Sequence, residues 1–220
     1  MKPSVGVAII GGSGYGAGEL LRYLTAHPQV RVASVVSSSQ SGELISKAHP
    51  HLSGFYSGLK FESAVNWEQL KTFGQCVVFL ALPHGHSGKF IHALGNSPHK
   101  DLRVIDLAAD FRLSAESIHT RTYPDVQFDA PLRESFVYGL PELSQEKIKS
   151  ARRITNPGCL ATASILAAAP LIENYREQIV GSLCFDAKTG TSGAGRAAQD
   201  SMHHPLRHGN FEAYKILCHR

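Results

Sequence analysis

Short apolar runs alternate with amphipathic segments through the first half of the chain. The apolar runs predict strands over Val5–Ile10, Val30–Val36, Cys76–Leu82 and Arg103–Leu107. The spacing of apolar residues between them predicts helices over Ala17–His27, Trp67–Thr72 and Ser87–Leu94. Buried strands that alternate with helices are typical of a parallel sheet with helices on both faces. The first half is therefore predicted to be an α/β domain of the Rossmann type.

The regular alternation stops in the second half of the chain. Prolines interrupt Ser114–Glu146, which we expect to be rich in loops. After a strand-like run at Arg152–Thr155, Leu160–Ala169 is predicted to be a buried helix and Val180–Ala187 a strand. We place a domain boundary near residue 150, so that residues 1–150 form the first domain and residues 151–220 belong to a second.

The composition and charge of the chain limit the kinds of molecule it is expected to bind. The chain has 220 residues, is 43% hydrophobic and carries a formal net charge of +4. Its basic residues are scattered, which favours a small anionic ligand over nucleic acid. The four cysteines form no C-x-x-C pair and no apolar stretch approaches membrane-spanning length. We expect a cytoplasmic protein with no nucleic-acid or membrane partner.

A glycine-rich turn follows the first predicted strand. Gly11-Gly12-Ser13-Gly14-Tyr15-Gly16 lies between that strand and the first helix, the place where a backbone can approach a pyrophosphate closely. This context favours a dinucleotide site over a plain strand–helix turn. At the end of the second strand, Ser37-Ser38-Ser39-Gln40 stands where NAD-binding chains carry an acidic residue. Hydroxyls there, at Ser37 and Ser39, favour NADP, and a solvated loop is the alternative interpretation.

A second motif carries a candidate nucleophile. Pro157 and Gly158 predict a tight turn after Asn156, which places Cys159 at the start of the next helix. Unpaired amides and the helix dipole at that position favour a thiolate over a thiol. Cys159 is therefore a candidate covalent nucleophile.

Several segments together resemble the N-acetyl-gamma-glutamyl-phosphate reductase family, which is related to aspartate-semialdehyde dehydrogenase. The segments, in chain order, are Gly11–Tyr15, Ala81–Gly85, Asp106–Arg112, Tyr138–Glu142, Asn156–Cys159 and Ser192–Arg196. The resemblance implies an NADP-binding Rossmann domain followed by an α+β catalytic domain. It implies NADPH-dependent reduction of N-acetyl-glutamyl 5-phosphate to N-acetyl-glutamate 5-semialdehyde, with release of phosphate, through a thioester on Cys159, in arginine biosynthesis. It also implies a homo-oligomer when the protein is full length.

The resemblance and the residues assign roles to the remaining candidates. His219 is the expected acid–base partner of Cys159, by its position in the family pattern. Pro83 and Gly193 are expected to contact the cofactor, and Arg112, Arg196, Asn156 and His84 the substrate. Arginine matches phosphate and carboxylate geometrically, and His84 ends a predicted strand where open α/β sheets place ligands.

The other histidines, cysteines and acids receive simpler interpretations. His203, His204 and His208 are expected at the surface, and Pro205 argues against a zinc site on a helix there, so we expect no metal. We expect Asp106 and Asp110 to order loops, Cys76 and Cys184 to lie in the core, and Cys218 to have no catalytic role.

The sequence departs from the family pattern in three places. Ala17 occupies the third glycine position, and Leu160-Ala161 replaces the usual Tyr-Pro after the nucleophile. Family members are longer, so the catalytic domain is expected to be incomplete after Arg220. Two alternatives stay open: the same chemistry on an aspartyl or aminoadipyl phosphate, and a non-catalytic NADP-binding remnant.

Overall fold

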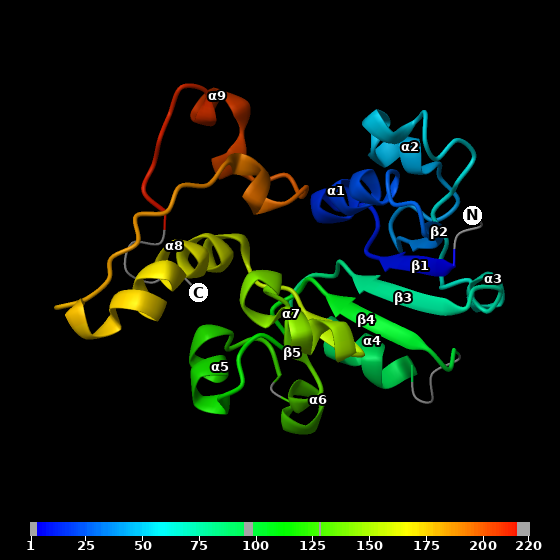
Figure 1. Cartoon of the computed structure of the whole chain (residues 1–220). Helices are drawn as coiled ribbons and strands as arrows, with labels where there is room; N and C mark the ends of the chain where they lie inside the picture. The colour runs from blue at the N-terminus through cyan, green and yellow to red at the C-terminus, as the bar shows by residue number, and fades with distance from the viewer. Residues whose placement is uncertain (1–3, 95–98, 128, 215–220) are drawn as a thin grey trace. The chain divides into compact units, whose positions relative to one another are not determined.

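The structure is a computed structural model that describes residues 4–94, 99–127 and 129–214. The chain divides into two compact units, Met1–Asn156 and Pro157–Arg220 (Figure 1).

The first unit is built on a parallel sheet. Its described residues form β1 (Val5–Ile10), β2 (Val30–Val36), β3 (Gln75–Leu80), β4 (Leu102–Asp106), β5 (Val137–Tyr138) and β6 (Arg153–Thr155). The strand order is β2-β1-β3-β4-β6-β5, and every neighbouring pair is parallel. This arrangement confirms the predicted α/β sheet.

Helices connect these strands. They are α1 (Tyr15–Leu24), α2 (Ile45–Ala48), η1 (Pro50–Leu52), α3 (Trp67–Leu70), α4 (Ser87–Leu94), α5 (Glu116–Thr122), α6 (Ala130–Glu134) and α7 (Pro141–Ser150). The predicted bounds of β1, β2 and α4 are confirmed. The stretch predicted to be rich in loops contains α5, α6, β5 and the start of α7. One of these short helices, α6, has a side-chain cap: Asp129 accepts a hydrogen bond from Leu132 N.

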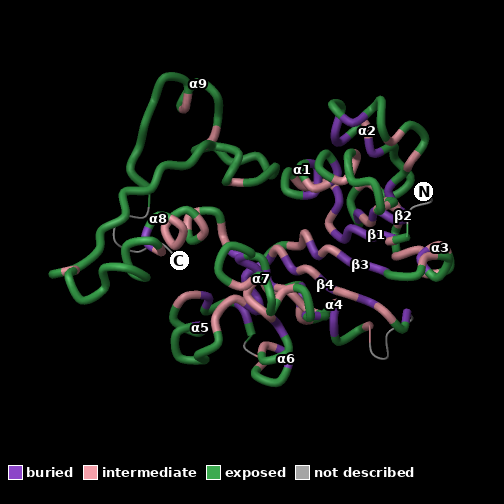
Figure 2. Tube along the Cα trace, viewed as in Figure 1, coloured by how far each residue is buried: buried purple, intermediate pink, exposed green. Residues whose placement is uncertain are grey.

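The sheet is buried on both faces because its strands are apolar at successive positions. Val7 and Ile9 of β1 pack in one core with Leu21 of α1. Ala8 and Ile10 point to the other core, which includes Ile91 of α4. The buried tube segments of Figure 2 follow these strands. Two covered faces leave the ends of the sheet as the places where a ligand can bind.

The strand order creates a switch point in the sheet. From β1 the chain first crosses to β2 on one side, and later returns to β3 on the other side of β1. The connections that follow β1 and β3 therefore diverge at the carboxyl ends of these strands. Open α/β sheets bind ligands at such a point. The glycine-rich turn directly follows β1, and Pro83 and His84 lie in the connection after β3.

The second unit is mainly helical where it is described. It contains α8 (Cys159–Tyr175), η2 (Arg176–Gln178), η3 (Thr191–Ala194), η4 (Asp200–Met202) and α9 (His204–Arg207). The strand predicted over Val180–Ala187 is wrong, and Cys184, expected in the core, is exposed. The helix predicted from Leu160 is present, but Ala168 is its one buried residue. Most of the α8 tube in Figure 2 has the colours of intermediate and exposed residues. No described strand of this unit is available to pair with residues 180–187, and a strand needs such a partner.

In the described parts of the chain, no helix has the length and apolar character needed to cross a bilayer.

Candidate functional site

The turn after β1 requires glycine at its first two positions. Gly11 has φ +82°, and an added Cβ would lie 2.3 Å from the carbonyl oxygen of Ala81. At Gly12 an added Cβ would lie 2.2 Å from Val35 Cγ1. Both amides donate to the carbonyl of Val36 at the end of β2, at 3.0 and 2.8 Å. The turn is thus pressed against the neighbouring strands, which explains two of its glycines by packing alone.

Gly14 differs, because nothing in the protein excludes a side chain there. Its φ is −75°, and the nearest atom to an added Cβ is the carbonyl oxygen of Gly11 at 3.7 Å. Gly14 is the N-cap of α1, whose first amides carry the positive end of the helix dipole. Open space at a helix N-terminus fits the diphosphate of a dinucleotide, so this turn can hold the expected cofactor. Tyr15 and Gly16, also predicted contacts, form the exposed first residues of α1.

Helix α1 packs closely against its neighbours at Ala17, the third glycine position of the dinucleotide motif, and at Gly18 after it. Ala17 is fully buried, in agreement with a small residue at that position. At Gly18 an added Cβ would lie 2.6 Å from Nδ1 of His49. His49 is a buried histidine that the sequence reasoning did not single out.

Three serines form a hydroxyl cluster between the glycine-rich turn and the end of β2. Ser37 Oγ donates to Ser13 Oγ at 3.1 Å and lies 3.4 Å from Ser39 Oγ. Glu62, the nearby acidic residue, is engaged by Ser34 Oγ and by Asn66 Nδ2 instead. The cluster therefore presents neutral hydroxyls where a carboxylate would repel a phosphate.

The connection after β3 is ordered by two aspartates, as the sequence predicts. Asp110 accepts hydrogen bonds from the amides of Gly85, Ser87 and Gly88, at 2.9, 3.1 and 3.3 Å. Asp106 accepts from Ser87 Oγ at 2.6 Å. Carboxylates that bind the amides at the start of α4 stabilise its N-terminus and fix the loop before it.

Within that loop, Pro83 and His84 are exposed. The Nδ1 atom of His84 accepts from the amide of Ala109 at 3.1 Å, which places the proton of a neutral ring on Nε2. His84 therefore presents an N–H donor at the carboxyl end of the sheet.

Asp106 is also the most perturbed acid of this region. It is completely buried, and its Oδ2 has no hydrogen-bond partner. Burial raises the pKa of Asp106 to about 6, although hydrogen bonds from Ser87 and Ala108 oppose the rise. Thr155, its register partner on β6, is buried too, and its Oγ1 lacks a partner.

Arg112 joins the ends of two strands. Its Nε donates to the carbonyl of Asn156 at 2.9 Å, and its Nη2 donates to the carbonyl of Leu107 at 2.8 Å. The amide of Asn156 in turn donates to the carbonyl of Asp106 at 2.7 Å. Arg112 thus has a structural role at the carboxyl ends of β4 and β6, with other guanidinium N–H groups left for an anion.

In the second unit, Cys159 is the first residue of α8 and is exposed. Gly158 is the N-cap, and its carbonyl accepts from the amide of Thr162 at 2.9 Å and from Thr162 Oγ1 at 3.0 Å. The sequence-based placement of this cysteine at a helix start is therefore found in the structure. Cys76 differs, since burial raises its thiol pKa to about 11. An exposed sulfur at a helix N-terminus suits nucleophilic attack, and a buried thiol does not.

The remaining predicted residues lie in exposed parts of the second unit or outside the described residues. Gly193 is part of η3, and its amide donates to the carbonyl of Gly190 at 3.1 Å. Arg196 follows that short helix and is exposed. His204 and His208 stack with ring centroids 5.1 Å apart on exposed α9 and its cap. His219 and Cys218 lie outside the described residues.

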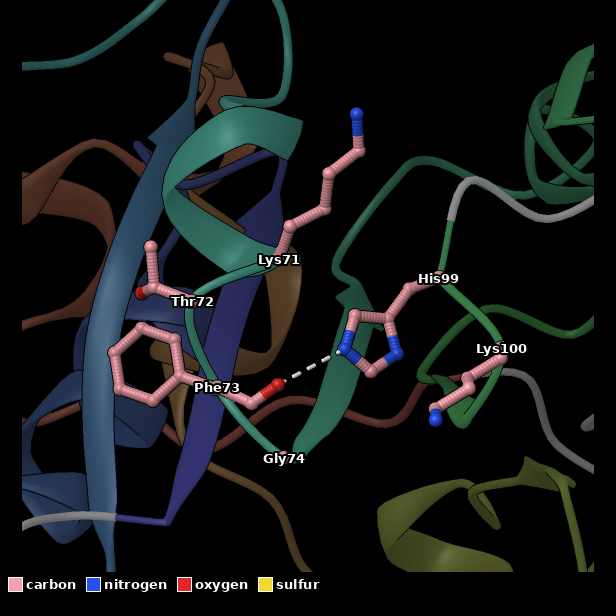
Figure 3. Close-up of a pocket in the computed structure, with 6 residues that line it drawn as sticks. All are labelled: Lys71, Thr72, Phe73, Gly74, His99 and Lys100. Carbon is pink, nitrogen blue, oxygen red and sulfur yellow. Dashed lines mark hydrogen bonds between the residues drawn. The ribbon is translucent and has the colours of Figure 1, made fainter.

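A pocket lies at the opposite ends of the strands. It has a volume of about 530 Å³ and is lined by Lys71, Thr72, Phe73, Gly74, His99 and Lys100, which precede β3 and β4 (Figure 3). His99 Nε2 is bound to the carbonyl of Phe73 at 3.1 Å, and its Nδ1 accepts from the amide of Asp101. Lys71 pairs with Glu68 at 2.7 Å. Because this pocket lies at the amino ends of β3 and β4, and the candidate residues follow the carboxyl ends of the strands, the pocket is not part of the candidate site.

Comparisons with known proteins divide the chain close to the boundary between the two compact units. Residues 6–151 match a family model described as semialdehyde dehydrogenase, NAD binding domain. Residues 159–220 match one described as semialdehyde dehydrogenase, dimerisation domain. An aspartate semialdehyde dehydrogenase with NADP from Candida albicans has a similar fold, with TM-score 0.51 and 15% identity, over 77% of this chain and 47% of that one.

Curated relatives carry two kinds of name. An N-acetyl-gamma-glutamyl-phosphate reductase from Methanosphaera stadtmanae is 41% identical over 98% of this chain and 59% of its own length. A LysW-L-2-aminoadipate/LysW-L-glutamate phosphate reductase from Sulfolobus acidocaldarius is 40% identical over 97% of this chain and 59% of its own length. The chain thus spans well under two thirds of the length of these relatives.

Proposed function

This chain belongs to the semialdehyde dehydrogenase family, and we propose that it is the cofactor-binding and nucleophile-bearing part of an NADPH-dependent acyl-phosphate reductase. The proposed reaction converts N-acetyl-glutamyl 5-phosphate to N-acetyl-glutamate 5-semialdehyde and phosphate, in arginine biosynthesis. The proposal rests on one feature of each unit: an open glycine-rich turn at a sheet switch point in the first, and an exposed Cys159 at a helix start in the second.

The cofactor is proposed to bind at the carboxyl end of β1. The amides at the start of α1 face the diphosphate, and Gly14 lets it approach the backbone. The Ser39 hydroxyl, and the Ser37 hydroxyl once its O–H rotates away from Ser13, donate hydrogen bonds to the 2′-phosphate of NADP, and the exposed Pro83 borders the site. Gly193 is proposed as a further cofactor contact, as the family resemblance implies. The proposed preference for NADP over NAD is tested by comparing the dissociation constants for NADPH and NADH in titrations of the protein. A Ser37→Asp variant is expected to lose affinity for NADPH, because a carboxylate repels the 2′-phosphate.

The nucleophilic step uses the sulfur of Cys159. The thiolate attacks the acyl carbon, the C–O bond to phosphate breaks, and a thioester forms. When bound, NADPH supplies the hydride that reduces this thioester to the aldehyde level. The C–S bond of the resulting thiohemiacetal then breaks, which releases the aldehyde and restores the thiolate. His219 is proposed to move the proton between the sulfur and the oxygen in these steps.

Cationic and donor groups are proposed to hold the substrate. Arg112 and Arg196 offer guanidinium N–H groups to its phosphate and carboxylate. Asn156 and the Nε2–H of His84 add neutral donors. Arg112 keeps its two main-chain bonds while doing so, which fixes its orientation.

The reaction is tested in the reverse direction with purified chain, N-acetylglutamate semialdehyde, phosphate and NADP⁺, by following the absorbance of the reduced cofactor. Turnover that Cys159→Ser abolishes supports the enzyme. Cofactor binding without turnover supports the alternative of a non-catalytic NADP-binding remnant, a relevant alternative because the chain spans 59% of its relatives' length.

A second substrate class follows from the names of the relatives. Because a LysW-aminoadipate/LysW-glutamate phosphate reductase is about as similar to this chain as the N-acetylglutamyl enzyme, an aminoadipyl phosphate is the alternative substrate. An aspartyl phosphate is a further one. Parallel assays with the corresponding semialdehydes distinguish them by the ratio of kcat/KM. We also propose that the full-length protein is a homo-oligomer, which sedimentation analysis tests; the dimerisation-domain match supports this.

A further inference from the structure

A buried histidine outside the predicted site touches the glycine-rich turn. His49 lies between α2 and η1, is 2% exposed, and forms a 2.8 Å hydrogen bond between its Nε2 and the carbonyl oxygen of Gly12. A carbonyl only accepts, so Nε2 carries the proton and donates. This bond joins two segments that are 37 residues apart in the chain.

The bond completes the fixation of Gly12. The amide of Gly12 already donates to the carbonyl of Val36 at 2.8 Å. With His49 on its carbonyl, both backbone polar groups of Gly12 are held by the surrounding protein. The Gly12 carbonyl lies in the peptide plane between Gly12 and Ser13, so His49 holds that plane directly, while the Val36 bond holds the preceding plane between Gly11 and Gly12.

The orientation of that plane decides where the next amide points. The described part of the chain contains no cis peptide bond, so the C=O of Gly12 and the N–H of Ser13 point in opposite directions. Because the carbonyl points toward buried His49, the amide of Ser13 points away from it. It belongs to the same turn as the open position at Gly14.

The packing around His49 keeps the ring in place. Its ring meets Phe61 edge-on, with centroids 6.4 Å apart. Only a glycine fits at position 18 of α1, where an added Cβ would lie 2.6 Å from Nδ1 and 2.8 Å from Cε1 of His49. A rigid ring that is held on several sides fixes its hydrogen-bond partner better than a mobile one.

We infer that His49 is a positioning residue that aims the Ser13 amide at the dinucleotide diphosphate. This inference rests on the proposed function, since it requires that the turn binds a dinucleotide. The effect is on cofactor binding, because His49 itself is buried beneath the turn and does not touch the ligand.

The test compares the dissociation constant for NADPH, from fluorescence titration, in three variants. His49→Leu removes the donor and is expected to raise the constant about tenfold, as the loss of one positioned hydrogen bond would. His49→Gln returns an N–H donor and is expected to stay within about threefold of wild type. His27→Leu is the control: this ring is exposed, and its Nδ1 accepts a local hydrogen bond from the amide of Gln29 at 3.3 Å, so the dissociation constant is expected to be unchanged.

Circular dichroism of each variant checks that it is folded. If His49→Leu does not fold, Gly18→Ala replaces it, since the added methyl displaces the ring and is also expected to weaken binding. Wild-type affinity in the folded His49→Leu or Gly18→Ala variant overturns the inference and leaves the proposed function standing. Equal weakening in the Leu and Gln variants also overturns it, because the donor then has no effect. A wild-type chain that binds neither NADPH nor NADH refutes the proposed function and the inference with it.

Discussion

Replacing Gly14 by alanine is expected to separate dinucleotide binding from folding. The φ of −75° and ψ of 163° at Gly14 are open to any residue, and the added Cβ would have ordinary contact at 3.7 Å. Alanine is a poorer N-cap than glycine, which lowers the free energy of unfolding by about 0.5 kcal/mol. Alanine also restricts the unfolded chain more than glycine, which raises the free energy of unfolding by about 0.4–1 kcal/mol. These effects nearly cancel, so the free energy of unfolding is expected to change by less than about 1 kcal/mol.

The same methyl group is expected to weaken cofactor binding strongly. It occupies the space at the start of α1 through which a diphosphate reaches the backbone amides. An anion held farther from these amides loses hydrogen bonds and the favourable helix dipole. We expect the dissociation constant for NADPH to rise at least about tenfold, which corresponds to about 1.4 kcal/mol.

Two other glycines provide matched controls for the free energy of unfolding. Gly11→Ala combines a φ of +82° with a clash against Ala81, and is expected to cost about 2–5 kcal/mol. Gly42→Ala has a φ of +86° but open space around it, so only the backbone cost of about 1–2 kcal/mol is expected. Urea unfolding and NADPH titration of all three variants check these values. The reasoning is refuted if Gly14→Ala is as unstable as Gly11→Ala, or if it binds NADPH like wild type.

Two further predictions concern titratable groups. Because the pKa of Asp106 rises from 3.8 to about 6 on folding, its contribution to stability is complete below about pH 3.8 and is lost as pH rises through about 6. Asp106→Asn is expected to remove this fall, which is roughly 2 kcal/mol in the free energy of unfolding by urea between pH 4 and 7; an unchanged pH profile would contradict the assignment. For the cysteines, iodoacetamide labelling at pH 7 with peptide mapping is expected to be fastest at Cys159, slower at exposed Cys184 and slowest at buried Cys76. Equal rates at Cys159 and Cys184 would show that the helix start does not activate the sulfur.

The first unit was predictable because its signals are local and agree with one another. The β1 run is apolar at every position except a glycine, and the structure buries alternate residues of it in two cores. Such a strand needs no information from distant residues to be recognised. The short helices α5 and α6 were missed because they have about two turns or fewer, too few for an apolar period to appear.

The candidate site was predictable where a motif carries its own geometry. In the turn after β1 and at the start of α8, glycine or proline beside the functional residue indicates the turn in the sequence. His49 has no such signal, because its partner Gly12 is 37 residues away in the chain. The one indirect sequence signal for His49 is Gly18, because a glycine inside a helix indicates that another group approaches the helix closely there.

The second unit shows why propensity alone does not make a strand. Residues 180–187 alternate in a way that favours a strand, yet Val180 is 95% exposed and no described residue pairs with them. Backbone groups in a strand must be bonded to a neighbouring strand, and apolar side chains must face a core. The same reasoning applies to α8, whose sequence is apolar while Leu171, Ile172 and Tyr175 are exposed. Both segments carry the pattern of buried elements without buried surroundings.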